Sequence, residues 1–466
     1  MSQGTESEHR FRVSRRNFLK AGAVAGGGLL LGLNLPVGGR MARAEEGATE
    51  GADFAPNAWI RITADDQVTV LVDRSEMGQG VMTALPMLIA EELEADWDRI
   101  ATEFAPADEA YTNSLLGSQT TGGSTAIRNA WRPLREAGAA AREMLVAAAA
   151  QRWGVEFQAC EASGQVVRHP ASGRSATYGE LAAAAAEREV PETVFLKDPK
   201  DYRLIGTPRD RLDAPAKVDG SARYGMDVQL DGLLTAQVVR CPVIGGRVRS
   251  FDAEQARQVP GVRQVVEIDA GVAVIADGFW PASKGREALS VEWDYGENAD
   301  LTSAAIERRF REAADSGEAA TARSEGDVET ALSGAARTVE AEYEVPFLAH
   351  GCMEPMNCTA RIADGVCEVW APTQNQTATQ EVAAKISGLP KEQVRVHTTF
   401  LGGGFGRRSH TDFVADAVAC AKAAGAPVKV MWTREETTRH DHYRPATYNR
   451  LAAAIDEDGQ VSGWRH

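Results

Sequence analysis

Leu401-Gly402-Gly403-Gly404-Phe405-Gly406-Arg407-Arg408 joins a strand-like stretch, residues 394–399, to a helical stretch, residues 411–424. Glycines at such a junction let backbone N–H groups approach an anion closely, and the N-terminus of the following helix adds partial positive charge. Arg407 and Arg408 add formal charge. The pattern therefore predicts a loop that binds a phosphate or oxo group. A plain tight turn is the alternative.

A nicotinamide-dinucleotide site is a second alternative for this loop, because a glycine run after a strand also occurs there. The spacing is not G-x-G-x-x-G, however, and the acidic residue expected after the next strand is matched only weakly by Glu435. Both observations argue against a dinucleotide fold.

Two further loops combine glycines with polar side chains ahead of a helix. Glu76-Met77-Gly78-Gln79-Gly80 follows a strand, and Gly117–Thr125 precedes a long alanine-rich helix, residues 130–153. Gly78 and Gly80 allow close approach, and Gln79 can both donate and accept hydrogen bonds. Each loop alone also fits an ordinary turn.

Two segments suggest the wall of a site. His350–Cys358 and Ala371–Gln376 place thioether and thiol side chains beside amides, although core packing is the favoured explanation for Met353 and Met356. The run His440-Asp441-His442 has no third ligand at a suitable spacing, so we expect a hydrogen-bonding role there and no metal site.

The pattern of strands and helices predicts a mixed α/β or α+β protein with several domains. The last hairpin, residues 448–466, ends as its second strand begins, which suggests a truncated chain or half of a split protein. The expected divisions are a signal at 1–44, a linker at 45–58, a domain at 59–200, a small α+β domain at 205–297, a linker segment at 298–337 and an incomplete domain at 338–466.

The N-terminus carries an export signal. Ser14-Arg15-Arg16-Asn17-Phe18-Leu19-Lys20 is a twin-arginine core, an apolar stretch from 21 to about 37 follows, and Ala42-Arg43-Ala44 offers a cleavage site. A membrane anchor is the alternative. Because the twin-arginine pathway carries folded proteins, the signal predicts a periplasmic protein with a cofactor inserted before export.

Charge and cysteine spacing exclude two classes of site. The net charge of −16, without a basic stripe, argues against nucleic-acid binding. The six cysteines form no C-x-x-C pair, so we expect no iron–sulfur cluster in this chain and mostly buried free thiols, with a Cys352–Cys358 disulfide as the alternative.

Together and in this order, the segments resemble the xanthine oxidase and aldehyde oxidoreductase family, in particular the isoquinoline 1-oxidoreductase type of large subunit. The resemblance implies molybdopterin-binding domains, a small hammerhead-like α/β domain at 205–297, and molybdopterin as its cytosine dinucleotide, whose dithiolene sulfurs hold molybdenum. It also implies that Gln374 hydrogen-bonds an oxo group on the metal. The other cofactor-binding residues that it implies are Gly78, Gln79, Gly80, Gly122, Gly123, Ser124, Gly403, Gly404, Phe405, Gly406 and Arg407.

The implied activity is oxidation of a small molecule, an N-heterocycle or an aldehyde, with oxygen derived from water. Purine-oxidising relatives carry Gly-Lys-Glu where this chain has Arg407-Arg408-Ser409, which argues against xanthine. The implied partners are a small subunit with two 2Fe-2S clusters and a c-type cytochrome. The family's glutamate base is expected beyond His466, so no catalytic residue is assigned. An inactive remnant that binds only cofactor or partner is the alternative function.

Overall fold

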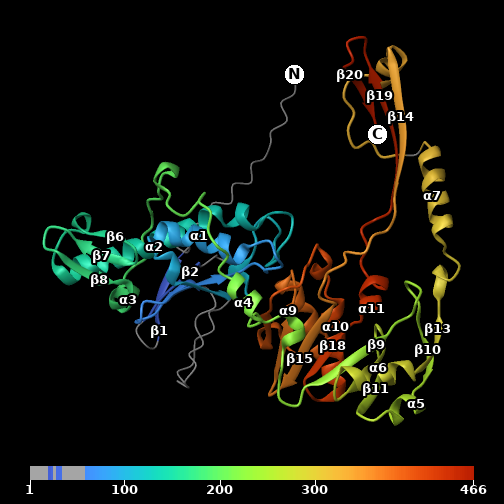
Figure 1. Cartoon of the computed structure of the whole chain (residues 1–466), viewed down its shortest axis with the longest axis horizontal. Helices are drawn as coiled ribbons and strands as arrows, with labels where there is room; N and C mark the ends of the chain where they lie inside the picture. The colour runs from blue at the N-terminus through green and yellow to red at the C-terminus, as the bar shows by residue number, and fades with distance from the viewer. Residues whose placement is uncertain (1–18, 25–27, 34–57, 318) are drawn as a thin grey trace. The chain divides into compact units, whose positions relative to one another are not determined.

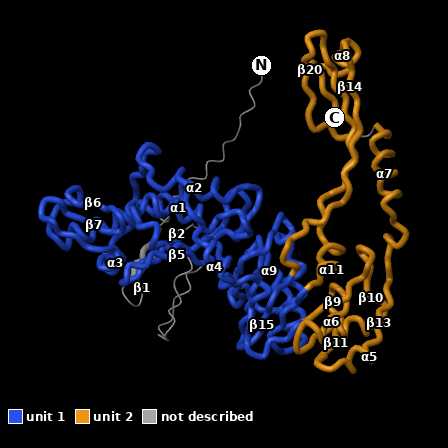
Figure 2. Tube along the Cα trace, in the orientation of Figure 1, with its two compact units in different colours: residues 1–235, 357–431 blue, residues 236–356, 432–466 orange. Residues whose placement is uncertain are grey.

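A computed structural model describes residues 19–24, 28–33, 58–317 and 319–466 (Figure 1). The twin-arginine pair Arg15-Arg16, the expected cleavage site at 42–44 and most of the linker at 45–58 lie outside the described residues. Residue contacts divide the chain into two compact units, coloured separately in Figure 2. Unit 1 comprises the chain up to Thr235 together with Asn357–Met431, and unit 2 comprises Ala236–Met356 and Trp432–His466.

The first sheet of unit 1 has the strand order β1-β2-β3-β4-β5. Its strands are β1 (Leu19–Val24), β2 (Gly28–Leu33), β3 (Ala58–Ile62), β4 (Val68–Val72) and β5 (Ile100–Phe104). Neighbours are antiparallel except β4 and β5, which are parallel. Every residue of β4 is buried, as expected of a strand covered on both faces. No strand was expected at β1 and β2, which lie in the stretch assigned to the export signal.

Two long helices pack beside this sheet, α1 (Val81–Leu93) and α2 (Ala126–Trp153). Alanines and glycine on α2 bring the two backbones close together. A Cβ atom added to Gly138 would lie 2.5 Å from the carbonyl oxygen of Ile89 on α1. This close approach fixes the crossing of α1 and α2, and therefore the position of the loops that precede both helices.

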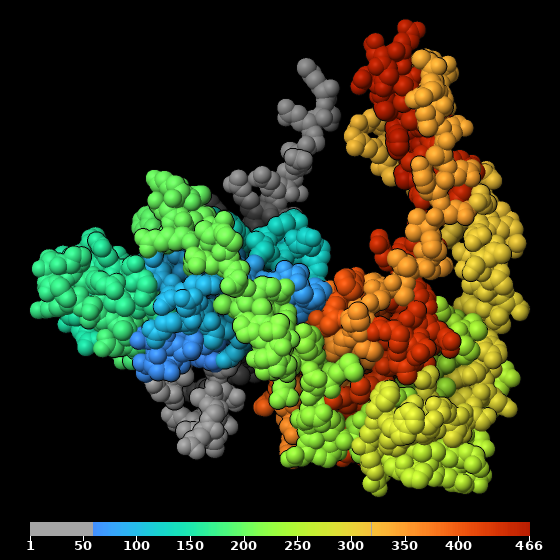
Figure 3. Space-filling model, viewed as in Figure 1, coloured from blue at the N-terminus to red at the C-terminus, as the bar shows by residue number. Residues whose placement is uncertain are grey.

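The alanine-rich helix α3 (Tyr178–Ala186) begins at Thr177, where a capping box with Glu180 satisfies its first N–H groups. Between α2 and α3 lies the antiparallel sheet β6-β7-β8, with strands β6 (Glu161–Ser163), β7 (Val166–His169) and β8 (Arg174–Thr177). A short helix α4 (Ala214–Asp219) follows. In Figure 3 the green surface of residues around 200 lies over the blue surface of the α1 region.

Unit 1 also contains part of a larger sheet, and this part has the order β18-β15-β16-β17. Its strands are β15 (Asn357–Ala363), β16 (Val366–Ala371), β17 (Val394–Thr398) and β18 (Val428–Met431). Helix α9 (Gln376–Ser387) connects β16 to its parallel neighbour β17, and α10 (Asp412–Ala424) packs on β15 and β18. The glycine run therefore lies between β17 and α10, as the sequence predicted.

Unit 2 contains short strands and exposed helices. In this unit β11-β12-β9 are neighbouring strands of a larger sheet, and β10-β13 and β14-β19-β20 form separate sheets. The strands are β9 (Leu234–Val239), β10 (Arg247–Asp252), β11 (Val262–Ile268), β12 (Gly271–Ala276), β13 (Ser290–Asp294), β14 (Arg337–Val345), β19 (Thr447–Ile455) and β20 (Val461–Arg465). The helices are α5 (Glu254–Gln258), α6 (Phe279–Glu287), α7 (Ser303–Asp315), α8 (Val328–Ser333) and α11 (Arg434–Arg439).

The predicted mixed α/β class is confirmed, with specific differences. The sequence of residues 97–104 predicts one continuous strand. In the structure this stretch begins as a 3-10 turn, Trp97–Arg99, because the Asp96 side chain accepts the N–H of Asp98 and holds a turn there. The sheet β6-β7-β8, strands β10 and β15 and helix α6 were not predicted. In β15, the polar residues Asn357 and Thr359 hide the apolar alternation that signals a strand.

Within the described residues, all six cysteines are free and buried, which confirms the expectation of buried thiols. Across the same ranges, no helix combines the length and the apolar character that a membrane crossing requires.

Candidate cofactor site

Gln374 lies at the centre of the contacts between the polar loops of unit 1. Its backbone carbonyl accepts the N–H of Thr121 at 2.8 Å and its N–H donates to Arg408 O at 2.9 Å. The side-chain Oε1 accepts the N–H of Gly406 at 3.1 Å, and Nε2 donates to Thr121 O at 2.9 Å. The second hydrogen of Nε2 has no partner among the described residues, although the side chain is only 3% exposed. A buried amide with one unused donor is suited to a ligand.

The glycine run packs directly against this amide. A Cβ atom on Gly404 would lie 2.6 Å from both Gln374 Oε1 and Met77 Sδ, so only glycine fits there. Gly403 and Gly406 have positive φ angles of 90° and 103°, and Phe405, which is 69% exposed, has a φ of 55°. A non-glycine residue in this region is strained, and such strain is typical of functional loops.

The two arginines of the glycine run are fully buried. Arg407 forms a bidentate ion pair with Asp412 on α10, at 2.9 and 2.7 Å. Arg408 donates from Nε to Gly403 O at 2.8 Å. The sequence suggested that both add charge for a ligand. In the structure their side chains hold the loop itself, Arg407 through Asp412 and Arg408 through the carbonyl of Gly403.

The loop from Ser75 to Gly80 reaches the same place. Leu401 N–H donates to Glu76 O at 3.0 Å, and Ser75 Oγ donates to Thr373 O at 2.6 Å. Gln79 folds back on its own loop, accepting Met77 N–H and donating to Ser75 O, each at 2.8 Å. A Cβ atom on Gly78 or Gly80 would meet nothing within 4 Å, so this loop borders open space.

Glu76 closes the N-terminus of α1. Its carboxylate accepts the N–H groups of Gly78 at 2.8 Å, Gly80 at 3.1 Å and Met82 at 3.1 Å, and the side chain is fully buried. An internal carboxylate therefore occupies the position at which a helix N-terminus would otherwise attract an anionic ligand.

The loop before α2 is open. The N–H groups of Gly122, Gly123 and Ser124 donate to no group in the described part of the chain, and an added Cβ on Gly122 would meet nothing within 4 Å. Thr125, at the N-cap, makes no side-chain capping hydrogen bond. Three consecutive donors at the start of a long helix are suited to phosphate oxygens.

A buried ion pair, Asp73 with Arg74, lies directly before the loop that begins at Ser75. Arg74 also donates to Tyr111 O at 3.2 Å, which joins the end of β4 to the segment that leads into the α2 loop. Burial raises the pKa of Asp73 from 3.8 to about 6, although Arg74 lowers it. The charge of the Asp73–Arg74 pair, which precedes the Ser75–Gly80 loop, therefore changes at mildly acidic pH.

The three predicted loops and Gln374 are thus joined within unit 1, through contacts of Ser75, Glu76, Thr121, Leu401 and Gly406. Of the predicted site residues, Gly406 bonds to Gln374, whereas Gln79 bonds within its own loop and Gly122–Ser124 make no hydrogen bond with the other loops among the described residues. The segment His350–Met356 lies in unit 2. There Asp441 accepts the backbone N–H of His350 at 2.6 Å and contacts its Nδ1 at 2.8 Å. The predicted hydrogen-bonding role of the 440–442 run agrees with these contacts.

Sequence reasoning missed the residues that connect the loops. Ser75 lies in no predicted motif, and Thr121 lies in the predicted Gly117–Thr125 loop without having been assigned a role. The role of each follows only from the pairing of distant segments. Arg211, which donates to Gly78 O at 2.9 Å, was also missed. The sequence did offer one signal for Arg211. A carboxylate such as Glu76, if buried in a glycine loop, requires a cation from elsewhere in the chain to balance its charge.

Three family descriptions match parts of this chain. Residues 27–218 and 311–466 each match a family described as a molybdopterin cofactor-binding domain, and residues 12–32 match the twin-arginine translocation signal sequence. The chain is 34% identical to isoquinoline 1-oxidoreductase subunit beta of Brevundimonas diminuta, over 98% of this chain and 64% of that protein. It is 31% identical to a membrane-bound aldehyde dehydrogenase (pyrroloquinoline-quinone) of Gluconacetobacter polyoxogenes, over 97% of this chain and 59% of that protein.

Among solved structures, quinoline 2-oxidoreductase from Pseudomonas putida 86 matches with a TM-score of 0.47 and 21% identity, over 56% of this chain and 38% of that one. The chain spans 64% and 59% of the lengths of the two curated relatives above. The two domain matches and the 34% identity to isoquinoline 1-oxidoreductase subunit beta support one assignment: the chain belongs to the xanthine oxidase and aldehyde oxidoreductase family of molybdopterin-binding large subunits.

Proposed function

We propose that this chain is the large subunit of an exported molybdenum hydroxylase that oxidises an N-heterocycle or an aldehyde with oxygen derived from water. The observation that carries the proposal is the convergence of the Gly78, Thr121 and Gly404 loops on the buried Gln374. The two curated relatives bear names of a heterocycle oxidoreductase and an aldehyde dehydrogenase, which supports the proposed substrate classes.

The residues present fit a pterin cofactor with a phosphate tail. The unused donor on Gln374 and the backbone of Gly404–Gly406 would hold its metal end. The loop at Gly78–Gly80 and the open N–H groups of Gly122–Ser124 would hold its pterin and phosphate oxygens, consistent with a cytosine dinucleotide form. The bound cofactor would supply two-electron oxidation chemistry, and the protein supplies binding, orientation and exclusion of water.

Electrons would leave through a partner. Within the described residues, the six cysteines are buried, and no group of three or more His, Cys, Asp or Glu side chains could hold a metal ion. We therefore propose a small subunit with two 2Fe-2S clusters, and a c-type cytochrome as its electron acceptor.

We assign no catalytic base to this chain. The proposed domains remain 59–200 and 338–466 for cofactor binding, with a hammerhead-like domain at 205–297.

The test is to purify the chain, co-expressed with a 2Fe-2S subunit and the cofactor-maturation proteins, and to measure molybdenum and cytosine nucleotide per chain. We expect both at close to one equivalent, and reduction of an artificial acceptor by an N-heterocycle or an aldehyde. Cofactor without turnover of any such compound would favour a chain that only binds. Molybdenum below one tenth of an equivalent in the matured protein would overturn the proposal.

A further inference from the structure

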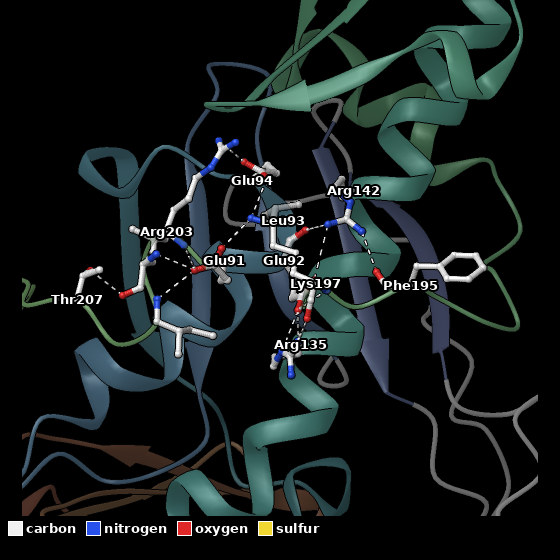
Figure 4. Close-up of polar contacts among 12 residues, drawn as sticks. Glu91, Glu92, Leu93, Glu94, Arg135, Arg142, Phe195, Lys197, Arg203 and Thr207 are labelled. Carbon is white, nitrogen blue, oxygen red and sulfur yellow. Dashed lines mark hydrogen bonds and ion pairs between the residues drawn. The ribbon is translucent and has the colours of Figure 1, made fainter. Parts of the chain in front are cut away.

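Residues 195–217, called the strap here, run beside α1 and are held at its C-terminal end by buried carboxylates (Figure 4). Glu91 Oε2 accepts three successive backbone N–H groups of the strap, those of Arg203 at 2.9 Å, Leu204 at 2.7 Å and Ile205 at 3.0 Å. Burial raises the pKa of Glu91, but the hydrogen bond from Lys197 and those from the strap backbone outweigh it, and the pKa lies below its ordinary value. The backbone N–H groups of the strap therefore stabilise the ionised form of Glu91.

Glu92 fastens the strap to α2 as well. Its carboxylate accepts Arg135 Nε at 2.8 Å and the backbone N–H of Lys197 at 3.1 Å. Carboxylates in the last turn of a helix oppose its dipole, so these two glutamates depend on the strap and on α2 for stabilisation. The hydrogen bonds of Glu91 and Glu92 thus fix the position of the strap at the C-terminal end of α1.

At the other end of α1, the strap contacts the glycine loop. Leu212 N–H donates to the side chain of Thr83 at 3.0 Å, in the first turn of α1. Arg211 donates from Nη1 to Gly78 O at 2.9 Å and from Nη2 to Glu76 Oε1, also at 2.9 Å. Asp213 holds the Arg211 guanidinium in this orientation with bonds of 3.0 and 2.8 Å. One planar cation thus fixes both the peptide of Gly78 and the carboxylate that caps α1.

The same cluster reaches the second glycine loop. Lys217 pairs with Asp213 and lies 3.7 Å from Glu76. Its ammonium sits 5.0 Å from the centre of the Phe400 ring, and Phe400 directly precedes Leu401, which donates to Glu76 O. The charges of the strap therefore contact the Glu76–Gly80 loop and the residue that precedes the glycine run.

We propose that Arg211 is a positioning residue: it sets the conformation of the Glu76–Gly80 loop for the cofactor, and it does so only when the strap is docked along α1. This inference rests on the proposed function, because the loop is assigned to the cofactor there. It adds a residue outside the cofactor loops and a route by which strap docking governs cofactor loading.

The test compares full-length chains carrying Arg211→Met and Arg211→Lys with the control Arg209→Met, all co-expressed with the small subunit and maturation proteins. Arg209 is an exposed strap residue, and in the described part of the chain its side chain donates hydrogen bonds to Thr207 and Arg203. The readouts are hydrogen exchange of the amides of Gly78, Gly80 and Met82, and molybdenum and cytosine nucleotide per chain.

For Arg211→Met we expect exchange at these three amides to become at least about tenfold faster, since a charge-assisted hydrogen bond is lost. The amides of Arg203–Ile205 should keep wild-type exchange, because Glu91 still holds them. Cofactor content should fall by half or more. Arg211→Lys should fall between wild type and Arg211→Met, because an ammonium keeps the charge but not the planar fork. Arg209→Met should match wild type.

Unchanged exchange at Gly78, Gly80 and Met82 in Arg211→Met would overturn the proposal. Faster exchange with wild-type cofactor content would also overturn it, because the loop conformation would then not matter for loading. Equal acceleration at Arg203–Ile205 would show general destabilisation and would overturn it too. If the wild-type protein holds no molybdenum, the proposed function fails, and the role in loading fails with it. Hydrogen exchange at Gly78, Gly80 and Met82 would still show whether Arg211 stabilises the Glu76–Gly80 loop.

Discussion

The N-termini of α1 and α2 both follow glycine loops, yet their backbone N–H groups have different partners. At α1, the buried carboxylate of Glu76 accepts three of them, and Arg211 balances its charge. At α2, the N–H groups of Gly122–Ser124 have no partner in the described part of the chain. The comparison teaches that a glycine loop before a helix is no proof of an anion site. The N-terminus of α1, the closed end, is capped by Glu76 and provides a fixed backbone surface. The N-terminus of α2, the open end, provides N–H donors for an anion.

The largest expected effect is at the closed end. Glu76→Ala removes the acceptor of three backbone N–H groups and leaves Arg211 without one of its two carboxylates. We expect the free energy of unfolding to fall by about 3 kcal/mol, below the usual upper range for a broken buried pair because Arg211 is partly exposed. Urea unfolding followed by tryptophan fluorescence measures it.

The matched control is Glu103→Ala, since Glu103 pairs with Arg61 on the surface of β5. A half-exposed surface pair should contribute less than about 1 kcal/mol. Equal losses in the two variants would contradict the idea that Glu76 acts as an internal cap.

The next largest effect distinguishes the tightly packed Gly404 loop from the open Gly122 loop by the stability of an alanine variant in each. Gly404→Ala places a methyl group against Gln374 and Met77, and we expect a loss of about 1–3 kcal/mol in unfolding free energy. Gly122→Ala meets no neighbour and should change stability by less than about 0.5 kcal/mol. Both variants should reduce molybdenum content, the second because its methyl group enters the open space before α2. A Gly122→Ala protein with full cofactor would argue against the α2 loop as a ligand site.

A smaller effect concerns pH at the closed end. Because burial raises the folded pKa of Asp73 to about 6, the folded protein retains a proton that the unfolded chain has lost. The stability that this proton provides is fully present below about pH 4 and is lost as pH rises through about 6, with a slope of about 1 kcal/mol per pH unit at most. Asp73→Asn should remove this slope between pH 4 and 6. An identical pH profile in wild type and Asp73→Asn would refute the assignment.

The smallest effect tests the open end directly. Inorganic phosphate should raise the Tm of the cofactor-free chain by about 1–2 °C relative to chloride at equal ionic strength, because the ligand binds the folded state only. Gly122→Ala should abolish the difference, whereas Arg209→Met should keep it. A shift of the same size in Gly122→Ala would place the phosphate elsewhere.

Much of the site could be predicted from local sequence. Gly403 and Gly406 adopt positive φ, and glycine is the residue that does so without strain. The helices after the glycine loops were expected within a few residues of their observed starts, because their apolar and alanine-rich patterns are long. Shorter elements such as β15 escaped, since polar residues interrupt their alternation. Which charges close the loops could not be predicted, because Glu76 and Arg211 are far apart in the chain.

The sequence by itself determined the export signal, the glycine loops and the family, since each depends on residue types at fixed local spacing. Only the tertiary structure decided how the arginines and carboxylates are used. Arg407 pairs with Asp412 and Glu76 caps α1, so neither side chain is left for a ligand, whereas the N–H groups before α2 are. The physical reason is that a charge in a buried loop takes the nearest opposite charge that folding provides, and that partner is set by packing and not by spacing along the chain.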